Sequence, residues 1–268
     1  DSHFHQRNLK FKVQTKNKIA KVPKNALIEI TNACNHACVF CYNPKMKRSI
    51  NKLDFNIFKK FIESCVKEQV QEIGLHTTGE PFMVKNLEDY ISFAKKSGIR
   101  RVYVTSNGAL ATLDRLKKCI DAGLDSIKFS INAATRNDYK ITHGHDDFEK
   151  VSKNLKDLYN YKISNNINIQ MLCSFVYTNL THKNIPIFKK NLSRYFDEVI
   201  YVKALNQGGR GVEVSKKLTN KLKNNKDKFE QEIKPCEMLW NRLHLTVEGY
   251  LTACCVDYEN DLIYTKLT

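Results

Sequence analysis

The sequence has no long apolar run, and no stretch approaches the roughly 18 apolar residues that a membrane-spanning helix requires. Residues 1–7 also lack the apolar segment of a secretory signal peptide. The chain does not begin with Met, so we expect that it is trimmed. These absences argue against a membrane protein and predict a cytosolic one.

Acidic side chains are scarce relative to basic ones. The chain has 28 Asp and Glu against 44 Lys and Arg, which gives a formal net charge of +16. Such an excess indicates an acidic partner: a nucleic acid, a phosphorylated substrate or an acidic peptide. No base-stacking motif or nucleic-acid-binding module is visible, and Lys and Asn are abundant throughout. General composition therefore explains the charge better than a nucleic-acid partner does.

The chain does contain enough apolar material, 42% of 268 residues, for one large α/β domain and a smaller appendage. Short β-rich runs alternate with amphipathic stretches. The β-rich runs predict strands at Leu27–Thr31, Glu72–Thr77, Arg101–Thr105, Ser126–Ile131, Ile167–Val176 and Glu198–Leu205. The amphipathic stretches predict helices at Asp54–Glu68, Leu87–Ser97, Leu113–Ala122, Phe148–Tyr161 and Ile185–Tyr195.

Strands that alternate with helices predict parallel strands joined by crossover helices. Six units fit a partial (β/α)6 TIM-like barrel, and an open doubly wound sheet is the alternative. In either fold the functional site lies at the carboxyl ends of the strands. Four polar segments follow predicted strands and are therefore expected at that edge: 34–41, 76–81, 106–108 and 130–132.

The pattern changes after about residue 206. Gln207–Gly211 is flexible in composition, and Lys216–Lys234 is polar and Lys-rich, which predicts a solvated helix or linker. Two alternating runs then meet at Glu248–Gly249 and predict a β-hairpin. We therefore divide the chain into an N-terminal extension, an α/β core, a basic linker and a hairpin segment, at 1–24, 25–206, 207–234 and 235–268.

Nine cysteines in a cytosolic chain of this size do not predict a disulfide framework. Cys65, Cys119 and Cys173 lie in helical or apolar runs, and we expect them to be packed thiols because free Cys behaves as a small hydrophobic residue. The other cysteines form two groups, at 34–41 and 236–255, that call for a chemical explanation.

The first group consists of Cys34, Cys38 and Cys41, with the spacing C-x3-C-x2-C. Soft thiolates select iron–sulfur clusters, zinc or Cu(I). Four thiolates would close a zinc site or fully ligate a cubane cluster, whereas three leave one iron open to bind a reactive molecule. Zinc needs a fourth ligand, and His36 is spaced awkwardly between Cys34 and Cys38. The spacing therefore favours iron–sulfur chemistry.

This loop resembles the cluster loop of the radical SAM superfamily, because it follows a first strand and carries an aromatic residue, Phe40, just before its third Cys. The run Thr78–Pro81 after the second strand resembles that superfamily's Gly-Gly-Glu-Pro motif, with Thr in place of the first Gly. The resemblance covers roughly residues 25–205 and identifies the α/β core as a radical SAM core.

The resemblance implies that Cys34, Cys38 and Cys41 each bind one iron of a [4Fe–4S] cluster, and that the fourth iron chelates S-adenosylmethionine (SAM). An electron from the cluster would break SAM into methionine and a 5′-deoxyadenosyl radical, which abstracts a hydrogen atom from an unactivated carbon. The cofactors carry the hard step, while the protein binds, orients and excludes water. The implied electron source is a low-potential donor such as flavodoxin or ferredoxin.

The resemblance also implies cofactor-binding residues. Gly79 and Glu80 would hold the methionine ammonium or shape the strand end, and Tyr42 would pack near the adenine. Ser130, with Asn132 beside it, lies where relatives place a ribose-binding group, and Asn107 could reach the same region. Ordinary strand-end polarity explains these three residues equally well. Three histidines near the expected site edge are secondary candidates, since a hydrogen-bonded His is commoner than a catalytic one: His76, His143 and His145.

The second cysteine group resembles the start of the SPASM and Twitch extensions, which ligate auxiliary [4Fe–4S] clusters in some radical SAM enzymes. Cys236 and Cys254 frame Gly249, with Trp240 between them. The resemblance makes Cys236 and Cys254 auxiliary-cluster ligands, whereas Cys255 is expected on the opposite strand face as a spare thiol. Buried thiols in a hairpin are the alternative. Because no cysteine follows Cys255, we expect either a truncated SPASM/Twitch-like segment or an incomplete auxiliary cluster.

Three reactions suit such an enzyme. Modification of a peptide or protein side chain ranks first by prevalence, although residues 1–24 are too few for a leader-binding domain. Dehydrogenation of a sugar or cyclitol alcohol follows closely, because that group shares the short N-terminus and the hairpin. Cyclisation of a nucleotide suits the basic charge but not the absence of a C-terminal Gly-Gly. Another class, an iron–sulfur or zinc protein that binds nucleic acid, would need a fourth ligand to close its metal site.

Overall fold

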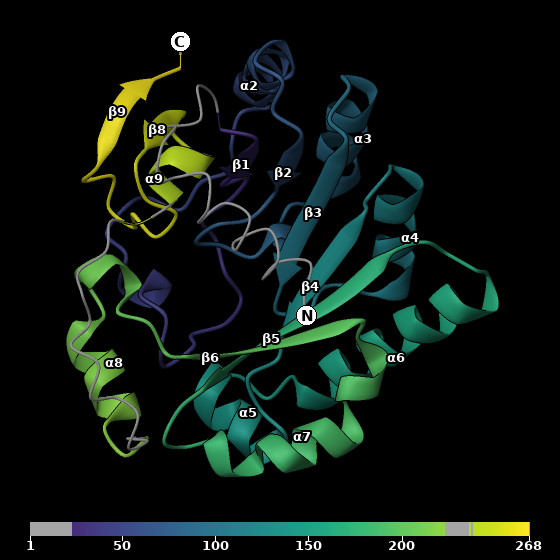
Figure 1. Ribbon diagram of the computed structural model, residues 1–268, viewed down its shortest axis with the longest axis vertical. Coiled ribbons are helices and arrows are strands. Elements are labelled where there is room, and N and C mark those ends of the chain that lie inside the picture. The colour runs from purple at the N-terminus through teal and green to yellow at the C-terminus, as the bar shows by residue number, and fades with distance from the viewer. Residues whose placement is uncertain (1–22, 223–235, 237, 268) are drawn as a thin grey trace, which may run out of the picture.

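The computed structural model describes residues 23–222, 236 and 238–267 (Figure 1). The strands are β1 Asn25–Ile28, β2 Glu72–Gly74, β3 Arg101–Ser106, β4 Ser126–Ser130, β5 Gln170–Tyr177, β6 Glu198–Lys203, β7 Arg242–Leu245, β8 Tyr250–Thr252 and β9 Ile263–Lys266. Within the described residues these strands form one sheet in the order β6-β5-β4-β3-β2-β1-β7-β8-β9. Strands β1 to β6 are parallel, β7 joins β1 in parallel, and β8 and β9 run antiparallel.

Helices cover one side of the parallel strands, and neighbouring helices α2, α3, α4 and α6 contact one another in turn (Figure 1). The hairpin strands β8 and β9 extend the sheet beyond β1, away from β6. The helices are α2 Phe55–Lys67, α3 Leu87–Lys96, α4 Leu113–Asp121, α5 Arg136–His143, α6 Phe148–Ser164, α7 Ile185–Asn191, α8 Val212–Thr219 and α9 Met238–Asn241.

The predicted six-unit partial barrel is confirmed. The sheet follows the chain from β1 to β6 without the reversal of strand order that a doubly wound sheet requires, so that alternative is wrong. The barrel stays open, because β6 ends the sheet on one side and β7 to β9 continue it on the other. In the part of the chain described here, no helix is long and apolar enough to cross a membrane.

Helix α2 illustrates how the sequence builds the covering layer. Its N-cap Asp54 accepts hydrogen bonds from the backbone N–H groups of Asn56 and Ile57, at 2.8 and 3.1 Å. Apolar residues recur at the spacing of one helical face and pack onto the sheet. The buried ones are Phe58, Phe61, Ile62 and Cys65.

Two predicted helix ends are confirmed by their glycines. Gly98 and Gly123 follow the last residues of α3 and α4 with φ angles of 108° and 102°, a conformation that Gly adopts without steric cost. The following residues then turn back into the sheet, which delivers β3 and β4 in the same direction. The crossovers therefore keep the carboxyl ends of all six strands at one edge.

The predicted hairpin is confirmed, with Gly249 in its turn at a φ of 82°. The parallel pairing of β7 with β1 was not predicted, since the two strands are far apart in the sequence. One buried ion cluster holds this junction together. Arg48 donates to Glu29 at 2.8 and 3.0 Å and to Glu248 at 2.8 Å. The extension is thereby fixed to the end of β1.

Some predictions on the chain's organisation are corrected or lie beyond the described residues. Strand β2 ends at Gly74, earlier than predicted, and a short 3-10 helix, η2 (Pro81–Met83), begins at the end of the motif that follows it. Helix α5 was not predicted, because it is only eight residues long and contains few apolar residues. Residues 1–22 and 223–235 lie outside the described part, so the four-part division of the chain remains a prediction.

Candidate active site

The cysteine loop lies at the carboxyl end of β1 and is anchored at its base by buried polar contacts. The side chain of Asn32 donates to Ser49 O at 2.9 Å and accepts from Asn51 N at 2.7 Å. The backbone N–H of Glu80 donates to Ala33 O at 2.8 Å. These bonds tie the start of the loop to residues 49–51 and to the segment after β2.

Gly79 passes directly against the base of this loop. A Cβ atom at this position would lie 2.3 Å from Thr31 O and 2.7 Å from Ala33 O, so no larger residue fits without moving the backbone. Thr78, which replaces the first Gly of the motif, donates from its hydroxyl to the buried carboxylate of Glu29. The motif after β2 is therefore a packing partner of the cysteine loop.

Glu80 connects this motif to the end of β3. Its carboxylate accepts from Phe82 N at 3.0 Å, from the Ser106 hydroxyl at 2.8 Å and from Asn107 N at 2.7 Å. Burial raises the pKa of Glu80 to about 7 in spite of these donors. The carboxylate thus holds the ends of two strands in register at the site edge.

The three loop thiols, Cys34, Cys38 and Cys41, are half-buried, and none is in a disulfide. Burial raises the pKa of Cys34 to about 11 and that of Cys38 well above its usual value. The thiolate form therefore needs a positive partner at this position. A bound metal supplies such a partner, because metal binding and thiol deprotonation are coupled.

Two of these sulfurs have hydrogen-bond partners in other parts of the chain. Cys34 interacts with the side chain of Asn107, which opposes the rise of its pKa. The Cys41 sulfur accepts from Asn43 N at 3.5 Å and lies 3.5 Å from the hydroxyl of Tyr258, in the C-terminal extension. The loop is therefore contacted from both the core and the extension.

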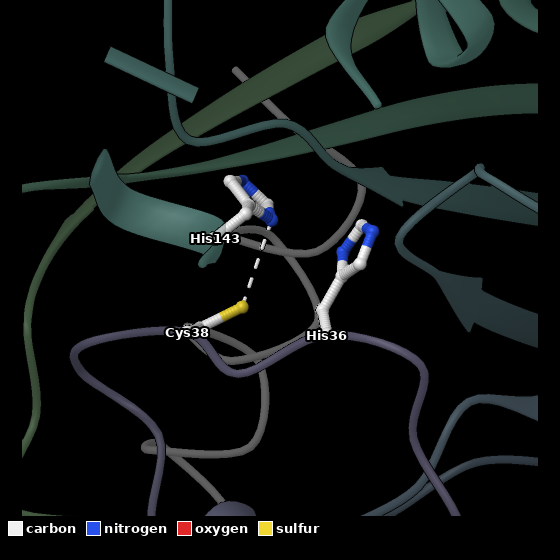
Figure 2. A group of neighbouring side chains, drawn as sticks. All are labelled: His36, Cys38 and His143. Carbon is white, nitrogen blue, oxygen red and sulfur yellow. Dashed lines mark hydrogen bonds between the residues drawn. The ribbon is translucent and has the colours of Figure 1, made fainter. Parts of the chain in front are cut away.

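The third sulfur, Cys38 Sγ, lies 3.6 Å from His143 Nδ1 at the end of α5, and the ring of His36 stands beside them (Figure 2). In the described part of the chain, these are the residues whose ligand atoms all lie within 4.8 Å of one another, close enough for a single metal ion. His36 Nε2 is 3.1 Å from Asp147. Burial lowers the pKa of His143 to about 3.

The predicted ribose-binding residues lie at the same edge but bond to protein groups. Ser130 Oγ is 3.4 Å from the hydroxyl of Ser174. Asn132 is buried, and its Oδ1 accepts from Val176 N at 2.7 Å while its Nδ2 lies 3.3 Å from His143 Nε2. The side chain of Ser130 is half-buried and that of Asn132 is committed to the protein, so their ribose roles remain predictions.

Tyr42, predicted near the adenine, packs against the C-terminal extension. Its ring centroid is 5.4 Å from that of Tyr258, and the guanidinium of Arg210 lies 5.6 Å from the Tyr42 centroid. Arg210 in turn pairs with Asp261. The aromatic side of the site is therefore built jointly by the loop and the extension.

The fold holds the second cysteine group less firmly than the first. Cys236 is exposed, whereas Cys254 and Cys255 are half-buried. Because β8 ends at Thr252, the last two lie in a turn, and the expectation that they occupy opposite strand faces is wrong. Their side chains share a hydrogen bond that lowers the pKa of Cys254 and raises that of Cys255. Their roles as auxiliary-cluster ligands remain predictions.

Basic side chains gather on the inner faces of the strands. Lys128 on β4 is paired in register with Thr105, whose hydroxyl lies 3.0 Å from His76 Nε2. Burial and the charges of Lys128 and Arg242 hold the pKa of His76 well below its usual range. Neither Lys128 nor Arg242 forms a side-chain hydrogen bond or ion pair with another described residue. Among the described residues, these two cations in the barrel therefore have no side-chain hydrogen-bond or ion-pair partner.

Sequence reasoning missed several residues that shape the site. The Asn43 amide donates to Asn32 O and to Thr78 O, both at 2.9 Å, and so bridges the loop and the β2 motif. Tyr258 reaches the Cys41 sulfur from a distant segment. His143 was one of the secondary candidates, but its contact with Cys38 was not predicted. Only the position of Asn43 directly after the cysteine run gave a local signal for its role.

Comparison with known proteins agrees with this geometry. The family model described as "Radical SAM superfamily" matches residues 28–182. A GTP 3′,8-cyclase of Chlorobaculum tepidum is 33% identical over 133 residues, which cover 49% of this chain and 39% of that protein. The chain spans between 39% and 54% of the lengths of the first curated relatives that it matches.

Solved structures share the fold at low sequence identity. SuiB of Streptococcus suis, bound to its precursor peptide SuiA, has a TM-score of 0.69 at 14% identity, over 97% of this chain and 65% of that chain. BtrN in complex with AdoMet and 2-DOIA has a TM-score of 0.56 at 18% identity, over 92% of this chain and 78% of that chain. With its family model matched over more than half of its length, the chain belongs to the radical SAM superfamily.

Proposed function

We propose that this radical SAM enzyme holds its [4Fe–4S] cluster on Cys34, Cys38 and Cys41 and modifies a peptide or protein side chain. The observation that carries the cluster assignment is the anchoring of the three thiols in one loop, whose base is fixed by Gly79 and Glu80. Membership of the superfamily makes the protein an enzyme that uses a [4Fe–4S] cluster and SAM. It also sets aside the alternative of a non-catalytic nucleic-acid-binding protein.

The residues fit the cluster that the family implies. Three soft thiols are present, which is the number that leaves one iron open. Burial of Cys34 and Cys38 opposes their ionisation unless a cation lies beside them. When bound, the cluster supplies the electron for reductive cleavage of SAM. The protein's own contribution is to hold the thiols and SAM in a site that excludes water.

The residues around the loop receive distinct roles in this proposal. The carboxylate of Glu80 is already occupied by three protein donors, so we assign it to holding the strand ends and assign the backbone at Gly79 to the SAM ammonium. Asn107 and Ser130 present polar groups at the same edge and are candidates for the ribose. Tyr42 offers an aromatic face to the adenine from the side of the extension.

A peptide or protein substrate is supported by the fold that the chain shares with SuiB, a protein solved with its precursor peptide. The similarity extends over 97% of this chain and includes the region after the barrel. The extension packs against Tyr42 and Cys41, so any substrate that it helps to bind would lie close to the cluster. An external low-potential reductant, such as flavodoxin or ferredoxin, is the proposed electron donor.

A phosphorylated small molecule is the second candidate substrate, and one observation favours it. Among the described residues, Lys128 and Arg242 have no side-chain hydrogen-bond or ion-pair partner. Both lie close enough to His76 for their charges to lower its pKa. Unpaired buried cations are costly, so a site of this kind suits a ligand that brings negative charge. The GTP 3′,8-cyclase among the relatives agrees with this candidate.

The first test is anaerobic reconstitution with iron and sulfide, followed by iron quantification and a dithionite-driven assay for 5′-deoxyadenosine. About four irons per chain with 5′-deoxyadenosine would support the primary cluster, and about eight would support an auxiliary cluster on Cys236 and Cys254 as well. A fully loaded, reduced protein that forms no 5′-deoxyadenosine would contradict the proposal.

The substrate class is tested by Lys128→Met together with Arg242→Met. If the substrate is anionic and small, the double variant raises the concentration of nucleotide needed to stimulate 5′-deoxyadenosine formation, while slow cleavage of SAM without substrate continues. If the substrate is a peptide that does not use this charge, turnover of candidate peptides is unchanged. Lys189→Met together with Lys190→Met, which removes two exposed lysines on α7, is the charge-matched control.

A further inference from the structure

The side chain of His143 points at a cluster thiol from outside the cysteine loop. Its Nδ1 lies 3.6 Å from Cys38 Sγ, and the residue is fully buried at the end of α5 (Figure 2). A nitrogen and a sulfur at this separation form an N–H···S hydrogen bond if the hydrogen is on the nitrogen. Which ring nitrogen of His143 carries the hydrogen therefore decides whether the contact is an N–H···S hydrogen bond.

The surroundings of the other ring nitrogen fix that state. His143 Nε2 faces two donors, the backbone N–H of Asn132 at 3.4 Å and the Asn132 side-chain Nδ2 at 3.3 Å. The amide orientation of Asn132 is set independently, because its Oδ1 accepts from Val176 N at 2.7 Å. Nε2 therefore accepts, and the ring hydrogen belongs on Nδ1, directed at the sulfur.

The ring is also held in place by its neighbours. Tyr139 stacks on it with centroids 4.0 Å apart and planes 5° from parallel. The ring of His36 packs against it edge-on at 5.4 Å. Because the imidazole is stacked on Tyr139, packed against His36 and hydrogen-bonded at Nε2, it has little freedom to turn its N–H away from Cys38.

The backbone of α5 is docked onto the cysteine loop on both sides of Cys38. Ala37 N donates to His143 O at 3.0 Å, and Val39 N donates to Thr142 O at 2.9 Å. Gly144 ends the helix with a φ of 68°, and a Cβ at that position would lie 2.8 Å from Ala37 O. The helix end and the loop therefore form one rigid unit.

We propose that His143 is a positioning residue that donates a hydrogen bond from Nδ1 to Cys38 Sγ and raises the reduction potential of the cluster. A reduced cluster carries more negative charge on its sulfur ligands, and a donor beside a sulfur stabilises that charge. Hydrogen bonds to the sulfurs are among the factors that set iron–sulfur potentials. The inference rests on the proposed assignment of Cys38 as a cluster ligand.

His36, Cys38 and His143 lie close enough together to hold a single metal ion, but their hydrogen-bond pattern argues against a metal site. With the hydrogen on Nδ1, His143 directs no lone pair at Cys38. His36 Nε2 is engaged with Asp147, and only its Nδ1 lacks a partner among the described residues. The two histidines therefore support one cluster ligand, with His143 bonded to Cys38 and His36 packed against His143.

The test is a redox titration of the reconstituted cluster, followed by EPR, in the wild type, His143→Phe and His143→Asn. His143→Phe keeps an aromatic ring against Tyr139 but removes the donor. We expect reduction to become roughly tenfold less favourable, a shift of about 59 mV to more negative potential for a one-electron couple. His143→Asn, whose amide nitrogen can occupy the position of Nδ1, should recover part of the shift.

The matched control is His145→Phe, since His145 is exposed, stacks on His36 and forms no bond with a cysteine sulfur in the described chain. Its potential should equal that of the wild type. The wild type alone gives a second readout: electron–nuclear double resonance should detect an exchangeable proton near the cluster together with histidine ¹⁵N coupling.

Failure of the inference and failure of the proposed function are distinguishable. A wild type that assembles no cluster, or that binds one zinc at His36, Cys38 and His143, would contradict the cluster assignment itself. A wild type with a normal cluster, no exchangeable proton and the same potential as His143→Phe would overturn only the role of His143.

Discussion

The two cysteine groups of this chain differ in how far the folded protein has prepared them. Around Cys34, Cys38 and Cys41, side chains from three other segments contact the sulfurs, and hydrogen bonds close the base of the loop. In the second group Cys236 is exposed, and Cys254 bonds mainly to its neighbour Cys255. Cysteine spacing alone does not make a site; the packing of the residues around the thiols does.

The difference matters for metal binding. Ligands that the fold already holds lose little conformational freedom when a cluster forms, whereas an exposed thiol must be ordered at that moment. We therefore expect the first group to bind iron independently of the second. The following experiments test this contrast, from the largest expected effect to the smallest.

Removal of a first-group ligand should have the largest effect. Cys34→Ala, Cys38→Ala or Cys41→Ala should reduce SAM cleavage to background, because a cluster ligand is lost. Cys236→Ala should keep uncoupled SAM cleavage while any auxiliary iron and substrate turnover are lost. Iron content and 5′-deoxyadenosine formation are the measurements. Wild-type cleavage in any first-group variant after reconstitution would contradict the assignment, and Cys119→Ala, a packed thiol in α4, is the control.

Loss of the buried ion cluster should separate the extension from the core. Arg48→Met leaves the buried carboxylate of Glu29 without its cationic partner, which costs about 3–5 kcal/mol of unfolding free energy. Urea unfolding measures the change. Arg136→Met, which breaks an exposed ion pair with Asp146, should leave the midpoint unchanged. Equal effects of the two substitutions would show that the junction does not depend on this cluster.

The two regions should respond to pH in opposite directions. The pKa of Glu80, about 7, is raised above its unfolded value of 4.5, so its stabilising contribution is complete below pH 4.5 and is lost as pH rises through 7. The pKa of His244 is lowered by burial, and then by Arg242, from 6.5 to about 4. Its contribution is therefore complete above pH 6.5 and is lost as pH falls through 4. Each is on the order of 3 kcal/mol.

Unfolding free energies of Glu80→Gln and His244→Gln, measured from pH 4 to 7.5, test these signs. The wild type should lose stability as the pH rises through 7, and Glu80→Gln should lack this loss. The wild type should also lose stability as the pH falls through 4, and His244→Gln should lack that loss. Parallel curves for the wild type and either variant would show that the residue does not titrate differently in the folded state.

The smallest effect is expected at the contact between the extension and Cys41. Tyr258→Phe removes the hydroxyl that donates to Gln207 at 2.7 Å and meets the Cys41 sulfur, but keeps the ring against Tyr42. We expect a loss of about 1 kcal/mol of unfolding free energy and no loss of iron. Thermal unfolding and iron analysis measure both, and complete loss of the cluster would mean that the extension is part of the primary site.

The sequence was a good guide where the pattern is local. The alternation of strands and helices predicted the six-unit barrel, and the glycines after α3 and α4 marked the helix ends. The cysteine loop and Gly79 were found because their residues are contiguous. Cys254 and Cys255 were misjudged because strand alternation was extended past Thr252, where β8 ends.

What could not be predicted depends on contacts between distant segments. His143 lies 105 residues from Cys38, in an eight-residue helix with few apolar residues, and nothing local connects the two. Tyr258 lies 217 residues from Cys41. The pairing of β7 with β1 likewise depends on strand edges that meet only in the folded sheet. Such contacts have no periodic or spacing signature.

The carboxylate of Glu29 has a consequence for how the protein is made. It binds Arg48 and Thr78 near the cysteine loop, and it accepts from Val247 N, 218 residues along the chain, at 3.1 Å. During synthesis the barrel emerges from the ribosome long before Val247 does. Until then this buried charge lacks one of its donors, so the nascent site stays incomplete. Cluster insertion is therefore best matched to the finished chain, and a ribosome stalled before Val247 should carry a barrel that binds iron poorly.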